Sequence, residues 1–498
     1  MHEFVEINDL EESLFNKFVP PDLRESFRKF NEGVTARSEG GGLKAFYSWQ
    51  NSPSADHDWL SRYWRNLLEQ RPDVVEAFPD LESWDRRAFL NWATETLKVE
   101  GSNPLIARPA KSALGMRWHP SKNPDDPVDL QIVGYLRRES SLGFVARRLV
   151  DESTSLVPRV GMLAYDRTRS TRLDWSPREP GEWRRAQSGA VINSSVVVVN
   201  SDQFAYLLAD LPMLRRESES LIGYWAWELE TPPRDSERFD HILDEIWVNS
   251  RYVQRAVKAG TSLPVRYVPL PLGVPETSSA TRSDFGIDED SFVFLTTFDF
   301  YSLRERKNPE GSIAAFKEAF PTPSRDVSLV IKTMHASERQ DEMAQLKALC
   351  ERRPDIMFID DVLYRNDHHR LLELSDCLVS LHRSEGFGLQ LAEAMHLGTP
   401  VIATRYSGNL DFMDDESSLL VDFTKSCPPS TQFHYPTDSS WAEPDVKHAA
   451  EYMFQIASDN KLQQRLSQSG KARIEKFDEM ARTLAKHHIS RVLRKNAL

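Results

Sequence analysis

Short apolar runs alternate with amphipathic stretches through most of the chain. In its middle part, runs with the length of a strand occur at residues 130–134, 195–199, 221–224, 245–248 and 265–268. Several of the gaps between these runs are long enough to hold a helix. This alternation is typical of a parallel sheet with helices on both of its faces. It predicts a first doubly wound α/β unit over residues 126–275.

The alternation starts again after a segment that has no helical periodicity. Residues 269–284, PLPLGVPETSSATRSD, are rich in Pro, Ser and Thr, and we interpret them as a linker between two units. Beyond the linker, strands are predicted at residues 292–297, 327–332, 356–359, 377–381 and 401–404. Helices are predicted at residues 309–320, 337–350, 366–374, 387–397, 443–458, 460–476 and 479–495. We expect a second doubly wound unit over residues 285–480, followed by a C-terminal helix over residues 481–498.

Residues 1–125 follow a different pattern and predict a helical module. Their apolar residues recur at helical spacing, as in the series Leu60, Tyr63, Trp64, Leu67 and Leu68. The same spacing favours a role in core packing, rather than as platforms for stacking sugars, for the tryptophans of this module, which are Trp49, Trp59, Trp64, Trp84 and Trp92.

The charge balance narrows the range of partners. The chain of 498 residues has 62 Lys and Arg against 75 Asp and Glu, a net charge of −13. A chain this acidic is not expected to bind nucleic acid. Its apolar runs are far shorter than the roughly 20 residues that cross a bilayer. Membrane contact is therefore expected to be peripheral at most. The basic residues Arg491, Arg494 and Lys495 are interpreted as a solvated helix end that complements the helix dipole, with a weak contact to acidic lipid as the alternative.

Cysteine usage and the start of the chain favour the cytoplasm. Cys350, Cys377 and Cys427 are too few and too unevenly spaced for a disulfide framework or a zinc site. The opening residues MHEFVEINDLEESLF are acidic and lack the basic start and apolar run of a secretory signal. We expect a cytoplasmic protein, which could work at the inner face of the membrane.

Residues 382–400, HRSEGFGLQLAEAMHLGTP, carry the most informative pattern, because they link a predicted buried strand to a predicted helix. Gly386 and Gly388 allow a sharp turn and a close approach to a ligand. The unpaired N–H groups at the helix start suit a diphosphate. Glu385 and Glu393 can accept hydrogen bonds from vicinal hydroxyls, Glu385 nearer a sugar and Glu393 nearer a ribose. Two solvated acids are the alternative, but the strand, turn and helix around them favour a site.

A second basic segment, FDFYSLRERKNP at residues 298–309, follows the first strand of the second unit. Asn308 and Pro309 are suited to the N-cap and first position of a helix, which places Lys307 just before a helix N-terminus. Lys307, with Arg304 or Arg306, can neutralise a leaving diphosphate; a surface cluster is the alternative. Because parallel strands end at one edge of their sheet, Lys307 and Glu385 are expected to converge.

These motifs give the chain a family resemblance. Residues 385–393, with Glu at both ends, the following EAMHLGTPVIATRYSGN and the RKNP segment resemble the retaining glycosyltransferases of family four, which have the GT-B architecture of two Rossmann-like domains facing a cleft. The resemblance covers residues 130–480. GYWAWELETPP and DEIWVNSRYV are similar to segments of a bacterial subgroup that builds surface polysaccharides. Residues 1–125 resemble a module that precedes some of these enzymes.

The resemblance implies roles for individual residues. Glu393 would bind the ribose, and Lys307 with an Arg would hold the diphosphate. Glu385 would hold the donor sugar together with the backbone that follows it, at Gly386, Phe387, Gly388 and Leu389. Relatives place a Gly-Arg pair before the Lys, whereas this chain has Asp299-Phe300-Tyr301, so the choice between Arg304 and Arg306 stays open. Glu228, near a position where some relatives have His, is a candidate contact for donor sugar or acceptor; a helix-start acid is the alternative.

The implied reaction transfers a hexosyl group from a nucleotide diphosphate sugar to an acceptor hydroxyl with retention. The leaving phosphate can take the acceptor proton, which fits the apparent lack of an Asp-His or Glu-His pair. The GT-B resemblance implies no cofactor and no essential metal; Asp288-Glu289-Asp290 is interpreted as a solvated turn. His335, His368 and His369 are interpreted as surface or core polar groups.

The acceptor and the wider role stay open. Residues 135–143, Asn200 and Asp202 follow predicted strand ends and are candidates for the acceptor side; loops without a substrate role are the alternative. The acceptor could be a glycan, a lipid-linked glycan, a protein or a small molecule. A nucleotide-sugar epimerase or phosphorylase on the same fold is an alternative activity. A noncatalytic scaffold that binds a glycan or protein is an alternative of a different class.

Overall fold

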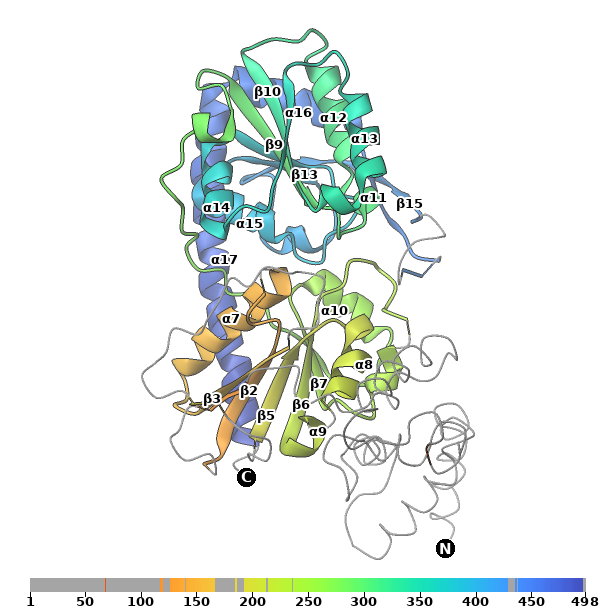
Figure 1. Cartoon of the computed structure of the whole chain (residues 1–498), viewed down its shortest axis with the longest axis vertical. Coiled ribbons are helices and arrows are strands. Elements are labelled where there is room, and N and C mark those ends of the chain that lie inside the picture. Colours follow the sequence, from red (N-terminus) through yellow and green to blue (C-terminus); the bar gives the residue numbers. More distant parts are fainter. Residues whose placement is uncertain are drawn as a thin grey trace, which may run out of the picture.

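The computed structural model describes residues 68, 117–119, 126–138, 140–165, 184–185, 192–211, 214–234, 236–428, 435–436 and 438–495. The predicted helical module over residues 1–125 lies almost entirely outside these ranges. Two α/β units follow one another along the chain, the second stacked above the first in Figure 1.

The first unit is built on an eight-stranded sheet in the order β4-β1-β3-β2-β5-β6-β7-β8. Its strands are β1 Arg117–His119, β2 Val128–Gly134, β3 Val160–Ala164, β4 Arg184–Arg185, β5 Ile192–Val198, β6 Ser218–Trp225, β7 Glu245–Val248 and β8 Val265–Tyr267. Neighbours from β3 to β8 are parallel, whereas β1 runs antiparallel to β3 and to β4. The predicted strands β2 and β5 to β8 are therefore confirmed, and β1, β3 and β4 were not predicted.

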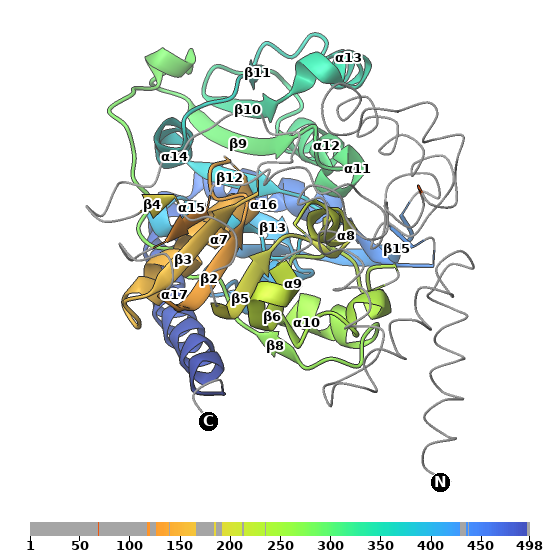
Figure 2. The same ribbon diagram turned by 60° about the horizontal axis from the view of Figure 1, so that its bottom comes forward.

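Helices cover both faces of this sheet. They are α7 Ser141–Thr154, α8 Ser201–Asp210, α9 Leu214–Glu217, the 3-10 helix η2 Ser236–Phe239 and α10 Arg251–Lys258. Side chains of α8 and α10 share one buried cluster with Val133, Val197 and Trp225 of the strands. Side chains of α7 share the opposite cluster with Ile132 and Trp247. In Figure 2, α8, α9 and α10 lie to the right of α7 and α17.

The second unit has a six-stranded parallel sheet in the order β11-β10-β9-β12-β13-β14. Its strands are β9 Phe292–Asp299, β10 Val327–Met334, β11 Ile356–Asp360, β12 Cys377–Ser380, β13 Val401–Thr404 and β14 Leu419–Val421. Its helices are η3 Ser283–Phe285, α11 Arg304–Lys307, α12 Pro309–Ala319, η4 Ala336–Glu338, α13 Gln340–Leu349, α14 Arg365–Leu374, α15 Leu389–Leu397, η5 Gly408–Asp411 and α16 Val446–Ser458. Every strand predicted for this unit is confirmed, and β14 is additional. Each unit is thus doubly wound, as the GT-B architecture requires.

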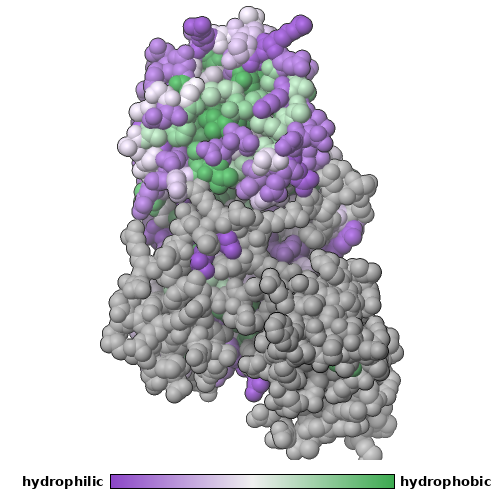
Figure 3. Space-filling view, viewed as in Figure 1, coloured by the Kyte–Doolittle hydropathy of each residue, from purple (hydrophilic) through white to green (hydrophobic). Residues whose placement is uncertain are grey.

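A small antiparallel hairpin projects from the second unit. It consists of β15 Phe423–Ser426 and β16 Trp441–Pro444, and Figure 1 shows β15 beside the gap between the units. On the face shown in Figure 3, hydrophobic residues gather on the second unit and hydrophilic residues surround them. No helix among the described residues has the length and hydropathy needed to cross a membrane.

The last helix is continuous, which corrects the two helices predicted at residues 460–476 and 479–495. Helix α17 runs from Asn460 to Lys495. It does not break because its buried stripe continues at helical spacing across the expected gap, through Ile474, Phe477, Ala481, Ala485, Ile489 and Val492. The predicted C-terminal helix at residues 481–498 is therefore the second half of a longer element.

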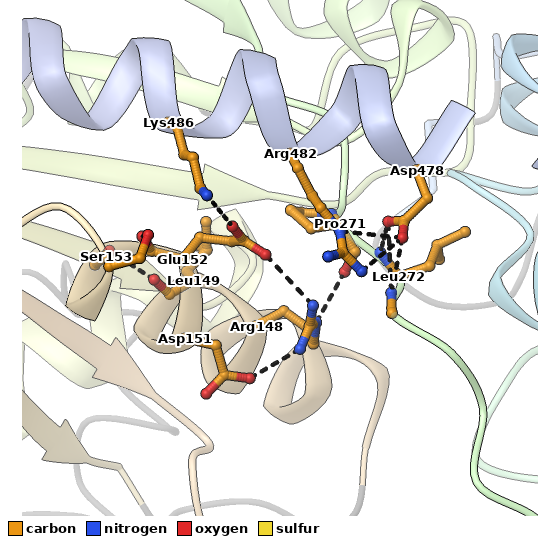
Figure 4. Close-up of polar contacts among 12 residues, drawn as sticks. Arg148, Leu149, Asp151, Glu152, Ser153, Pro271, Leu272, Asp478, Arg482 and Lys486 are labelled. Atoms are coloured by element: carbon orange, nitrogen blue, oxygen red, sulfur yellow. Dashed lines mark hydrogen bonds and ion pairs between the residues drawn. The ribbon is translucent and has the colours of Figure 1, made fainter. Parts of the chain in front are cut away.

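Helix α17 joins the two units, because it packs on α15 of the second and on α7 of the first. Figure 4 shows its polar contacts. Asp478 accepts from the backbone N–H of Leu272 in the linker at 2.6 Å, and Lys486 pairs with Glu152 of α7 at 3.5 Å. The linker predicted at residues 269–284 is irregular up to η3, and this helix holds it in place.

Candidate active site

The two predicted motifs meet at the carboxyl ends of β9 and β12. The Lys307 ammonium donates to Glu385 Oε1 at 2.5 Å, and the Arg306 guanidinium lies 3.3 Å from the same oxygen. These partners are 78 residues apart in the sequence. The structure therefore confirms the convergence that the parallel sheet predicted.

The turn before α12 positions Lys307. Asn308 has a left-handed backbone conformation with φ of 53°, which Asn tolerates better than most residues. Its side-chain oxygen accepts from the Gly311 N–H at 3.1 Å, so Asn308 is the predicted N-cap. Its amide donates to the carbonyl of Leu381 at 2.8 Å, which ties this turn to the strand that leads to Glu385.

The geometry distinguishes the two candidate arginines. Arg306 is only 5% exposed and donates to the Ser384 carbonyl at 2.9 Å. Arg304 points to α13, where it donates to the Glu342 carbonyl at 3.0 Å, and it pairs with Glu310 at 3.0 Å. Arg306, and not Arg304, is therefore the arginine beside Lys307 and Glu385.

The electrostatics at Glu385 favour an anionic ligand nearby. Burial would raise the pKa of the Glu385 carboxyl, but Lys307 and Arg306 outweigh burial and lower this pKa from 4.5 to about 2. The carboxylate is ionised at neutral pH and faces two cations. This excess of positive charge beside one acid is suited to a diphosphate.

The glycine turn that follows Glu385 starts helix α15 and brings the second unit close to the first. Gly388 has φ of 89°, and α15 begins directly after it, at Leu389 rather than at the predicted Phe387. No described side chain caps the N-terminus of α15. Gly386 makes a close approach to the first unit, since a Cβ there would lie 2.6 Å from the Trp227 carbonyl oxygen. The side chain of Phe387 packs in the core against Phe412, with ring centroids 5.0 Å apart, so only its backbone can face a ligand.

Glu393 lies on α15 among basic side chains that sequence reasoning missed. It is 5% exposed and accepts from Arg365 of α14, while the ring of His369 lies 3.3 Å from its Oε1. Burial opposes ionisation, but Arg365 and His369 prevail and lower the pKa of Glu393 to about 2. Arg365 also stacks over Phe144 of the first unit at 3.9 Å. The basic sequence RNDHHR at the start of α14 was the signal that could have revealed these residues.

Two histidines lie beside acidic side chains that the sequence did not predict as their partners. Contrary to the expected lack of Asp-His and Glu-His pairs, His335 Nδ1 lies 2.8 Å from Asp299 Oδ1, and His369 faces Glu393. Tyr301 stacks on His335 with centroids 3.9 Å apart. Both ring nitrogens of His368 are buried and hydrogen-bond to no described residue, and burial with nearby Lys332 lowers the pKa of His368 to about 3.

Several predicted residues of the first unit lie at the carboxyl edge of its sheet. Glu228 follows β6, and its Oε2 accepts from Tyr435 at 3.4 Å. Asn200 follows β5 and accepts from the Ala226 N–H at 2.9 Å, and Tyr135 follows β2. By contrast, the turn at residues 288–290 is exposed and precedes β9, which confirms its interpretation as a solvated turn.

Two doubly wound units, with a cation pair, a buried acid and an uncapped helix N-terminus at their facing edges, form the arrangement expected of a GT-B glycosyltransferase. The family comparison makes this more specific. Residues 280–473 match the family model described as "Glycosyl transferases group 1" and are a domain of that family. The range includes Arg306, Lys307, Glu385 and Glu393.

The chain is also similar to several solved structures. No curated protein sequence matches the chain. Among solved structures, Anabaena HepE in complex with UDP aligns at 14% identity and a TM-score of 0.49, over 74% of this chain and 99% of its own. Sucrose-phosphate synthase from Thermosynechococcus elongatus aligns at 14% and 0.48, over 71% and 96%. The pneumococcal O-GlcNAc transferase GtfA, in complex with UDP and GlcNAc, aligns at 16% and 0.41, over 60% and 57%.

Proposed function

We propose that this enzyme transfers a hexosyl group from a nucleoside diphosphate hexose to an acceptor hydroxyl, with retention at the anomeric carbon. The observation that carries the proposal is the placement of Arg306 and Lys307 beside Glu385, at 3.3 and 2.5 Å, next to the N-terminus of α15. Charge grows on the departing diphosphate during transfer. A preorganised donor aimed at such charge contributes about 3 kcal/mol of transition-state stabilisation.

In this mechanism, each part of the site has one task. Glu393 holds the ribose hydroxyls, Glu385 and the backbone of residues 386–389 hold the donor sugar, and Arg306 with Lys307 holds the diphosphate. The leaving phosphate oxygen takes the acceptor proton on the same face of the sugar. No protein base is then required, and the Asp299–His335 pair has no assigned step.

The acceptor side is the carboxyl edge of the first sheet. Glu228 is the candidate acid for a contact with an acceptor or the donor sugar, because it follows β6 at this edge and its backbone carbonyl accepts from Ser384, next to Glu385. A glycan, a lipid-linked glycan, a protein or a small molecule could supply the hydroxyl. We favour a role in polysaccharide or glycoconjugate synthesis in the cytoplasm, where the enzyme could work at the inner face of the membrane.

A melting screen against UDP, GDP and dTDP and their hexose derivatives tests the donor. A nucleotide at 100 times its Kd should stabilise the protein by about 2.7 kcal/mol. Glu393→Ala should lower the affinity for that nucleotide about tenfold. Glu373→Ala, which removes an exposed acid of neighbouring α14, should leave this affinity unchanged. The absence of any nucleotide effect would favour a noncatalytic scaffold, and epimerised free donor without acceptor would favour an epimerase.

A further inference from the structure

Arg365, the first residue of α14, contacts both units of the enzyme. In the second unit, its guanidinium donates to Oε1 of Glu393. In the first unit, it lies over the ring of Phe144, 3.9 Å from the ring centroid. A guanidinium can make both contacts at once, because its N–H groups lie in one plane and the face of that plane can stack on an aromatic ring. Figure 1 shows α7, which carries Phe144, and α14 on the same side of the molecule.

The contacts of Glu393 leave one carboxylate oxygen for a ligand. Nε2 of His369 lies 3.3 Å from Oε1, the oxygen that also accepts from Arg365, and Nδ1 of His369 donates to the carbonyl of Glu276 in the linker at 2.9 Å. Both contacts of the described residues with this carboxylate are therefore at Oε1. Oε2 stays available for a ligand hydroxyl, and its direction depends on how firmly Arg365 and His369 hold Oε1.

Phe144 belongs firmly to the first unit. Its backbone N–H donates to the carbonyl of Ser140 at 2.9 Å, and the Ser140 side chain caps α7 by accepting from the Gly143 N–H at 3.0 Å. Its ring is partly buried against the core cluster that α7 shares with the sheet. Phe144 also directly follows residues 135–143, the candidate acceptor side. Arg365 can therefore stack on this ring only while the two units keep their present arrangement.

We propose that the contact between Phe144 and Arg365 couples ribose binding by Glu393 to the arrangement of the two units. Arg365 is a positioning residue for Glu393, and Phe144 fixes Arg365 from the first unit. Without the ring, the guanidinium is free to rotate away from Oε1. The inference rests on the proposed function, in which Glu393 holds the ribose hydroxyls of the donor. Neither Phe144 nor Arg365 takes part in bond making.

The test compares ribonucleoside diphosphates with their 2′-deoxy forms. Calorimetry is run on the full chain with UDP and dUDP, ADP and dADP, and GDP and dGDP. The ratio of the two affinities measures recognition of the 2′-hydroxyl separately from the base and the diphosphate. The wild type should prefer the ribose form about tenfold or more, the effect of one hydrogen bond to a charged group.

Phe144→Leu keeps an apolar side chain but removes the ring, and it should lower this ratio about fivefold, the loss expected for one partly buried cation–π contact. Phe144→Tyr keeps the ring and should retain the ratio of the wild type. Phe454→Leu, which removes a ring that contacts Phe320, is the matched control and should change neither affinity.

A double-mutant cycle separates positioning from a general loss of packing. Arg365→Gln removes the cation and should lower the ratio at least as much as Phe144→Leu does. The double variant should lower it no further than Arg365→Gln alone, because the ring acts through the cation.

Four results would overturn the inference. An unchanged ratio in Phe144→Leu would show that the ring does not fix Arg365. An equal loss for ribose and deoxyribose forms, or losses that add in the double variant, would show a general effect on packing. A wild type that binds both forms equally would refute the ribose role of Glu393 while diphosphate binding stands. Failure of the wild type to bind any nucleoside diphosphate would refute the proposed function itself, and this inference with it.

Discussion

Replacing Glu385 by Gln tests the charge balance of the site. The substitution keeps the shape of the side chain but leaves Arg306 and Lys307 without their shared counter-charge. Against the effect of burial, Lys307 and Arg306 lower the pKa of Glu385 from 4.5 to about 2. At about 1.4 kcal/mol per unit, the ionised carboxylate stabilises the fold by about 3 kcal/mol. The side chain is only 13% exposed, so solvent screening reduces this figure little.

Four expected results follow from the loss of this charge. The free energy of unfolding of Glu385→Gln at pH 7 should be lower than that of the wild type by about 3 kcal/mol. A depressed carboxyl pKa stabilises above the unfolded-state pKa, so the difference should be constant above pH 5 and should shrink as the pH falls below about 4.5. A nucleoside diphosphate should stabilise the variant more than the wild type, because its phosphates replace the missing negative charge. Turnover should nevertheless fall severely, since the donor sugar loses its acceptor group.

The control is Glu373→Gln, which removes an exposed acid paired with Arg370 on the surface of α14. A surface pair contributes about 0–1 kcal/mol, so this variant should unfold nearly as the wild type does. The charge assignment is refuted if Glu385→Gln is as stable as this control. It is also refuted if diphosphates stabilise variant and wild type equally, or if turnover stays at the wild-type rate.

Two further predictions address other parts of the site. Gly386→Ala should lower kcat/KM about tenfold or more, because its Cβ would lie 2.6 Å from the Trp227 carbonyl oxygen and overpacking costs about 1–3 kcal/mol. Gly286→Ala strains the turn before β9, where φ is 71°, but its Cβ has no neighbour nearer than 3.9 Å, so kcat/KM should stay unchanged. Equal rates in both variants would show that the close packing at Gly386 is not the working state. The pKa of His368 is about 3 instead of 6.5, so below pH 6.5 the unfolded chain binds a proton at this residue while the folded protein does not. The free energy of unfolding therefore decreases as the pH falls from 6.5 toward 3. Between pH 8 and pH 5, wild type should therefore lose about 2 kcal/mol of unfolding free energy that His368→Asn keeps, and parallel pH curves would contradict the burial of a neutral ring.

Apolar runs in the sequence predicted most of the parallel strands, because a strand buried on both faces has no polar side to interrupt it. The parallel strands β3 and β14 were missed although their runs, VGMLA and LLV, are apolar. Strands β1 and β4, with the sequences RWH and RR, have no such run and pair antiparallel at one edge. No periodicity could reveal them. The break predicted in α17 failed for the opposite reason, since the buried stripe continues through Phe477 and Ala481 across the expected gap.

The active-site residues show the same limit at finer scale. The sequence placed Lys307 and Glu385 together because both follow strands of one parallel sheet. It could not choose between Arg304 and Arg306, because two residues apart on a helix differ by about 200° in direction. Only the packing of α11 decides which guanidinium faces the site. Arg365 was missed because it lies on α14, which no motif connects to Glu393.

The loop that holds Glu385 also holds the two units together. Ser250 of the first unit donates to the Gly386 carbonyl at 2.6 Å, and Ser384 donates to the Glu228 carbonyl. The units cannot separate without breaking both hydrogen bonds, and each lies next to Glu385 in the sequence. A substitution in this loop therefore changes donor binding and unit packing together. Affinity for a nucleoside diphosphate and turnover therefore have to be measured on the same variant. Comparing the two losses distinguishes a lost ligand contact from a lost contact between the units.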